Sequence, residues 1–211
     1  LGWGREVFAL AIAFQNLIWG LAQPVAGMIA DRYGAGRAIV AGSLMYAAGV
    51  ALMSQTTTPL DIQFSAGLLI GLGMSATSFA VVLSAVGRVV SPERRSLAFG
   101  VVSALGSLGQ LAMVPAGQAF LEAYGWPTAF LIFAVITLFM VPVAAAMRGR
   151  ADTTQLAARP EESLGQVLKL AMGNSSYRYL VAGFFVCGFH VMFIATHLPA
   201  YLTDAGFSGR T

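Results

Sequence analysis

The chain has 211 residues, of which 57% are hydrophobic and only 10% carry a charge, and its mean hydropathy is +0.75. Soluble globular domains contain about 25% charged residues, so this composition excludes a soluble domain and indicates a membrane protein with several spans. The net charge of +3 comes mostly from basic residues in short segments between apolar runs. No basic face or tail forms, which argues against nucleic acid as a partner.

Six stretches of the chain lack Asp, Glu, Lys and Arg and are long enough to cross roughly 30 Å of hydrocarbon. We therefore predict an all-α membrane protein with six transmembrane helices, embedded in a lipid bilayer. The predicted spans are residues 7–30, 38–54, 62–86, 97–121, 126–147 and 179–202. The spans 38–54 and 126–147 have few polar side chains, so we expect them to face lipid.

The basic residues report the orientation of these spans. Ten of the twelve fall in three alternate polar segments, at residues 32–37, 88–95 and 148–178. Cytoplasmic loops carry an excess of Lys and Arg, so these three segments are predicted to be cytoplasmic and both ends of the chain to lie outside. The longest of them contains an apolar pattern over residues 164–171, which suits a short amphipathic helix at the membrane surface.

The polar segment between the first two spans has an informative spacing. Residues 27–37 read Gly-x-x-x-Asp-Arg-x-Gly-x-x-Arg, and the marked positions are Gly27, Asp31, Arg32, Gly34 and Arg37. Charges of both signs mark a membrane surface, and glycine lets the backbone reverse within a few residues. This hairpin resembles the signature loop of the major facilitator superfamily of secondary transporters. That family often has two adjacent basic residues at the end of the loop, where this chain has one.

The resemblance implies a fold and a mechanism. Members of that family have two six-span halves and work by alternating access, so the chain is expected to be a fragment of a twelve-helix fold, from span two to span seven. Its domains would be the N-terminal half without its first helix (1–147), a cytoplasmic inter-domain loop with the short amphipathic helix (148–178) and the first helix of the C-terminal half (179–211). The resemblance also implies roles for the charged residues: Asp31 holds the end of span two against the other half, while Arg32 and Arg37 stabilise the hairpin.

Two further segments narrow the resemblance. In residues 1–31, the sequence Gly-Trp-Gly-Arg at 2–5 precedes a span with the polar positions of residues 15–24. This segment and residues 189–201 look like bacterial carriers related to the oxalate/formate antiporter and monocarboxylate transporter group. This likeness implies a small organic acid, a monocarboxylate or dicarboxylate, as the substrate, with protons as a candidate coupling ion. It also implies a bacterial cytoplasmic membrane and a monomer when full length. No cofactor or metal is expected, and export of amphipathic organic compounds is the alternative function.

Polar side chains in two spans are candidates for the substrate pathway. Span 62–86 contains Ser75 and Ser78, and span 179–202 contains His190, Thr196 and His197. Polar groups in hydrocarbon need partners or water, and spans four and seven line the path in the resembled family. His190 is either a neutral imidazole bonded to a neighbouring helix or a contact for substrate or protons.

An enzyme is a remote alternative. An intramembrane serine protease would need a Ser-His pair, for which Ser75 and His190 are the only candidates. The residue after Ser75 is Ala76 rather than glycine, and such an enzyme would leave the charged hairpin at residues 27–37 unexplained. We therefore predict a transporter and not an enzyme.

Overall fold

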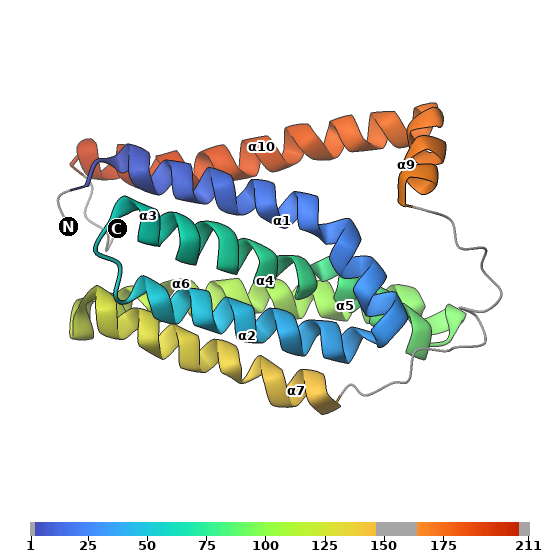
Figure 1. The fold of residues 1–211 in the computed structure, drawn as a ribbon, viewed down its shortest axis with the longest axis horizontal. Helices are drawn as coiled ribbons and strands as arrows, with labels where there is room; N and C mark the ends of the chain where they lie inside the picture. The colour runs from blue at the N-terminus through green and yellow to red at the C-terminus, as the bar shows by residue number, and fades with distance from the viewer. Residues whose placement is uncertain (1–2, 147–163, 207–211) are drawn as a thin grey trace. The chain divides into compact units, whose positions relative to one another are not determined.

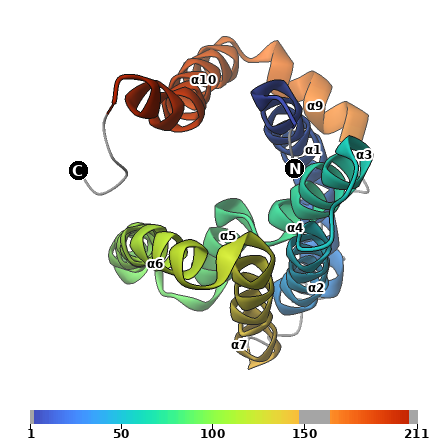
Figure 2. The same ribbon diagram turned by 90° about the vertical axis from the view of Figure 1, so that its left-hand side faces the viewer.

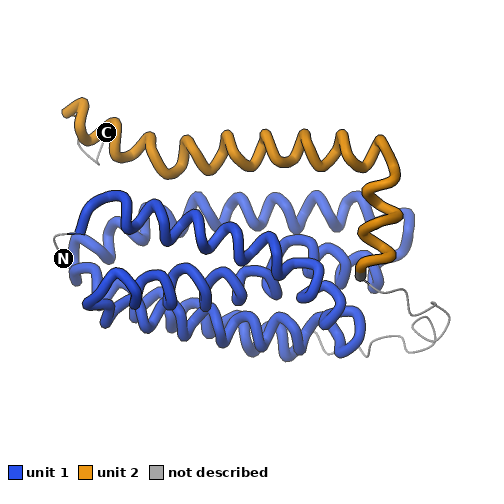
Figure 3. The backbone as a smooth tube through the Cα atoms, turned by 45° about the horizontal axis from the view of Figure 1, so that its top comes forward, with its two compact units in different colours: residues 1–153 blue, residues 154–211 orange. Residues whose placement is uncertain are grey.

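The computed structural model describes residues 3–146 and 164–206, and its chain divides into two compact units, Leu1–Thr153 and Thr154–Thr211 (Figure 3). Unit 1 holds α1 (Arg5–Tyr33), α2 (Ala35–Met53), α3 (Pro59–Ile62), the π-helix η1 (Gln63–Ile70), α4 (Gly71–Ala76), α5 (Phe79–Val89), the short helix η2 (Pro92–Arg94), α6 (Arg95–Leu138) and α7 (Met140–Ala146). Unit 2 holds α9 (Leu164–Gly173) and α10 (Ser175–Asp204). The predicted all-α class is confirmed.

Five helical stretches are long and apolar enough to cross a membrane, and one of them, Pro92–Ala146, has 55 residues. That length is well over twice what a single crossing needs. The stretch reverses at Gly125, whose φ of 74° and ψ of 168° are not helical. Across this turn the rings of Phe120 and Phe133 lie 5.9 Å apart, so the two arms of α6 run antiparallel (Figure 1). Counting both arms, the described chain contains the six predicted crossing segments.

The helix α2 is buried more than its sequence suggested. One face, with Gly42, Ser43 and Gly49, is covered by neighbouring helices. A Cβ on Gly42 would lie 2.9 Å from the carbonyl oxygen of Gly73 in α4, so the two backbones touch. Viewed along the helices, α4 lies beside both α1 and α2 (Figure 2). The expectation that residues 38–54 face lipid is therefore wrong for this face, because small residues bury a helix without polar side chains.

The predicted span 62–86 is a single crossing but not a single helix. It consists of η1, α4 and α5, and Thr77 and Ser78 separate α4 from α5. The hydroxyls of Ser75 and Thr77 donate hydrogen bonds to carbonyls one turn earlier, over 2.7 Å and 3.0 Å. Such bonds compete with the helical ladder and bend helices, which accounts for the interruption.

In the described part of unit 2, two helices are joined at Asn174. The side-chain oxygen of Asn174 accepts a hydrogen bond from the backbone N–H of Ser176 over 2.9 Å and so caps α10. The helix α9 covers the residues with the predicted amphipathic pattern, and its placement at the membrane surface stays a prediction. The predicted domain boundary at residues 147 and 148 lies outside the described residues, and the domain division stays a prediction.

Candidate functional site

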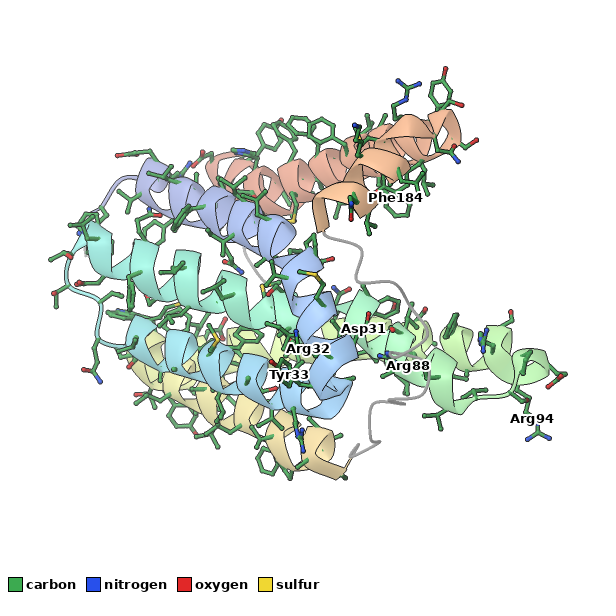
Figure 4. The ribbon with its side chains drawn as sticks, turned by 45° about the vertical axis from the view of Figure 1, so that its right-hand side comes forward. Asp31, Arg32, Tyr33, Arg88, Arg94 and Phe184 are labelled. Carbon is green, nitrogen blue, oxygen red and sulfur yellow. The ribbon has the colours of Figure 1, made fainter. Side chains whose placement is uncertain are left out.

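The hairpin between α1 and α2 meets the end of α5 through an ion pair. Nη1 of Arg88 lies 2.7 Å from Oδ1 of Asp31, and the two side chains are 46% and 50% exposed. Figure 4 shows the two side chains pointing toward each other from α1 and α5. The pair joins two crossing segments that are 57 positions apart in the sequence.

A small buried cluster lies next to Asp31. Ala30, one residue before Asp31, is buried in a small cluster with Ala38 and Ile39 of α2 and Val81 of α5. Asp31 follows Ala30 on α1, and Arg88 lies two turns after Val81 on α5. Both charges therefore lie at the same end of the helices. A half-exposed ion pair contributes about 0–1 kcal/mol. The Asp31–Arg88 bond can therefore break and re-form without unfolding unit 1.

The other residues of the signature spacing lie around this pair. Cζ of Arg32 lies 5.8 Å from the centre of the Tyr33 ring, a cation–π contact. Gly34 ends α1 and starts α2 with a φ of 96°, a conformation that side chains rarely adopt. A Cβ on Gly27 would meet no atom within 4 Å, and Arg37 is exposed with no ion pair to a described residue. Their roles in conformational switching stay predictions.

Sequence reasoning missed Arg88 as the partner of Asp31. Arg88 served there only as a marker of the cytoplasmic side. The one available signal was that both residues directly follow apolar runs on the same predicted side of the membrane. Arg32 and Arg148 share that property, so the sequence could not single out Arg88.

The two predicted pathway serines have different surroundings. Ser75 is 3% exposed, and its hydroxyl is bonded to the carbonyl of Leu72. A hydroxyl engaged within its own helix is not poised as a nucleophile, which weighs against the protease alternative. Ser78 is 5% exposed, and its hydroxyl has no partner among the described residues.

The three predicted pathway residues of the last span all lie on α10. The ring of His197 lies 4.8 Å from the ring of Phe193, one turn earlier, while His190 is exposed and Thr196 half-buried. These residues belong to unit 2, whereas the serines belong to unit 1. The two groups therefore belong to separate units, and a pathway shared by them stays a prediction.

Unit 1 also has a partly open pocket of about 590 Å³ between α1, α2, η1 and the two arms of α6. Its wall is mainly apolar, and its polar side chains are Gln15, Tyr46, Gln110 and Thr137. Among the described residues, no charged side chain lines it. A wall of this kind suits apolar or amphipathic molecules, because a bound anion would find no cation there.

The family model of the Major Facilitator Superfamily matches residues 1–211. Together with the crossing helices and the charged hairpin, this match defines the class of protein: the chain belongs to the Major Facilitator Superfamily and is an integral membrane protein of a transporter family. The resemblance expected from residues 27–37 is confirmed.

Curated relatives place the chain more narrowly. It is 28% identical over 203 residues to monocarboxylate transporter 11 of Mus musculus, covering 96% of this chain and 44% of the relative. It is also 28% identical over 206 residues to monocarboxylate transporter 13 of Bos taurus, covering 95% and 45%. Monocarboxylate transporter 3 of Gallus gallus is 33% identical over 125 residues, covering 59% and 23%. The chain thus spans less than half the length of these relatives, and the expected likeness to the monocarboxylate transporter group is confirmed.

Proposed function

We propose that this chain is part of a secondary active transporter that moves a small organic acid, a monocarboxylate or dicarboxylate, by alternating access. The observation that carries the proposal is the similarity, over 95–96% of the chain, to proteins named monocarboxylate transporters. The major facilitator halves that such a mechanism moves against each other each have six spans. Protons are the proposed coupling ion, and the full-length protein works as a monomer.

The ion pair at the hairpin supplies a reversible contact for this mechanism. In our proposal, Asp31 stays bonded to Arg88 in one access state and turns to the other half of the carrier in the opposite state. A half-exposed pair is weak enough for this exchange. The positive end of a helix or a basic side chain in the other half would serve as the second partner.

Flux measurements on the full-length carrier in proteoliposomes test this proposal. We expect saturable uptake of labelled pyruvate or oxalate by the wild type, and at least a tenfold loss of rate in the Asp31→Asn variant with little change in thermal stability. The double variant Asp31→Arg with Arg88→Asp exchanges the two charges. It restores the ion pair within unit 1 but not the contact of Asp31 with the other half, so it distinguishes the effects of these two contacts. Wild-type protein without saturable flux of any monocarboxylate or dicarboxylate refutes the organic-acid assignment.

We also propose the membrane and the orientation. The excess of basic residues supports a cytoplasmic hairpin at residues 31–37 with both ends of this chain outside. The likeness of residues 1–31 and 189–201 to bacterial carriers supports a bacterial inner membrane. Reporter fusions after Gly34 and after Gly125 test the orientation. A reporter active only in the cytoplasm should work at the first position and fail at the second, and the reverse pattern refutes the proposal.

Export of amphipathic organic compounds is the second candidate function. The apolar pocket of about 590 Å³ in unit 1 favours it, since no charged described residue lines that wall. Dye efflux from cells that express the full-length carrier discriminates between the two. Efflux that is blocked by Gln15→Leu, together with no pyruvate flux, would favour the exporter.

A further inference from the structure

The interruption of the third crossing segment, between α4 and α5, leaves backbone groups without helical partners inside the membrane. The helix α4 ends at Ala76, and α5 begins at Phe79. Thr77 has φ −98° and ψ 11°, and Ser78 has φ −64° and ψ 156°. This break lies near the middle of the predicted span 62–86. Non-helical backbone at that depth is tolerated only where protein buries it or where it lines a cavity.

The start of α5 has several donors without acceptors. The first hydrogen bond into this helix runs from the N–H of Val82 to the carbonyl of Ser78, over 3.1 Å. The N–H groups of Phe79, Ala80 and Val81 therefore precede the ladder, and no described residue accepts from them. An α-helix of 11 residues also carries the positive end of its dipole at this point.

The buried hydroxyl of Ser78 also indicates a ligand at the start of α5. Ser78 occupies the N-cap position of α5, where a side-chain oxygen lies beside the amides of the second and third helical residues. Its hydroxyl makes no capping bond, although the residue is only 5% exposed and the atom has no described partner. An unsatisfied buried hydroxyl costs about 1–3 kcal/mol. A ligand that accepts a hydrogen bond from the Ser78 hydroxyl would remove this cost.

Resting on the proposed function, we propose that this break binds the carboxylate of the transported organic acid. The carboxylate oxygens accept hydrogen bonds from the hydroxyl of Ser78 and from the first amides of α5. Helix starts bind anions through such amides, and interrupted membrane helices of transporters present their positive ends to anionic substrates. Hydrogen bonds from a hydroxyl and several amides are stronger to a carboxylate than to a neutral acid, and they offset the cost of burying its charge where no cation is near.

The chain contains a matched control for Ser78. Ser43 in α2 is 0% exposed, and its hydroxyl likewise has no described partner. Ser43 lies inside a continuous helix, away from any helix start. Removing its hydroxyl therefore tests the loss of an unbonded buried serine without touching the proposed anion site.

Equilibrium binding of labelled pyruvate to the purified full-length carrier tests the proposal. Hydrogen bonds to a charged group are worth about 1.5–3 kcal/mol, so we expect Ser78→Ala to raise the Kd at least about tenfold. Ser78→Thr, which keeps a hydroxyl, should bind as the wild type does, and Ser43→Ala should stay within about twofold. Ser78→Asp places a carboxylate of the protein at the site and should abolish binding.

The outcomes separate this site from the transport function. Binding that is lost in Ser78→Ala and kept in Ser43→Ala supports the site even if the wild type shows no flux, in which case only the transport proposal fails. Equal affinity of wild type and Ser78→Ala overturns the site, although flux by the wild type would still support transport. The absence of pyruvate binding by the wild type also overturns the site.

Discussion

Single residues decide how closely the helices of unit 1 approach. Gly42 in α2 and Gly73 in α4 pack so tightly that a Cβ on either would come within 3.0 Å of backbone atoms of the other helix. Membrane helices associate through such close contacts rather than through a hydrophobic driving force. The sequence shows these glycines, but it does not distinguish them from Gly20 and Gly27, whose Cβ positions are open.

This difference gives a prediction at the residue scale. We expect Gly42→Ala to destabilise the chain by about 1–3 kcal/mol, because a Cβ there meets Ala76 and the Gly73 carbonyl and overpacks the contact. Gly20→Ala is the control: no atom lies within 4 Å, and alanine favours a helix interior by up to about 1 kcal/mol over glycine. Thermal unfolding followed by circular dichroism in detergent measures both. Equal stability of Gly42→Ala and wild type would contradict the packing argument.

At the scale of elements, the turn inside α6 depends on one backbone conformation. Gly125 has a positive φ of 74°, while its only near contact for a Cβ is Pro127 at 3.9 Å. Space is therefore available, and strain is the obstacle to any other residue. We expect Gly125→Ala to cost about 1–3 kcal/mol. Gly109→Ala, in the same helix with open space around its Cβ, should be neutral or stabilising in the same unfolding assay.

The start of α3 gives a pH-dependent prediction. Hydrogen bonds from the backbone N–H groups of Thr57 and Thr58 lower the pKa of the Asp61 carboxyl, and Thr58 completes a capping box. Because the pKa of Asp61 is lower in the folded state, the ionised carboxylate stabilises the fold at pH values above the ordinary pKa. This stabilisation is lost as the pH falls through the pKa of the folded state.

We therefore expect the wild type to lose stability relative to Asp61→Asn as the pH drops below about 4. Circular dichroism of both chains at a series of pH values measures the difference. A constant difference between pH 7 and pH 3 would show that the cap does not depend on the charge of Asp61.

The sequence predicted the elements unevenly, for physical reasons. Hydropathy and charge gave the six crossing segments and the hairpin at Gly34, since both are local properties of the chain. The break before Ser78 was not predictable, because no glycine or proline marks residues 77 and 78. The Asp31–Arg88 pair was not predictable either, because it depends on how α1 and α5 pack against α2.

For the whole molecule, the length of the chain carries the main prediction. The chain spans 44–45% of its relatives monocarboxylate transporter 11 of Mus musculus and 13 of Bos taurus, and alternating access needs two halves that move against each other. We expect the 211-residue chain alone to show no saturable pyruvate flux in proteoliposomes, whereas the full-length carrier does. Flux by the short chain at the rate of the full-length carrier would refute the two-half mechanism.

The reversal at Gly125 also bears on how the protein is made. The arms of α6 meet with almost no intervening loop, so very little polar chain must be carried through the hydrocarbon when they leave the ribosome. The two arms can enter the bilayer together as one helical hairpin, with Tyr124 and Trp126 at its tip, where aromatic rings settle at the lipid headgroups. This geometry favours insertion of the two arms as a pair rather than one helix at a time.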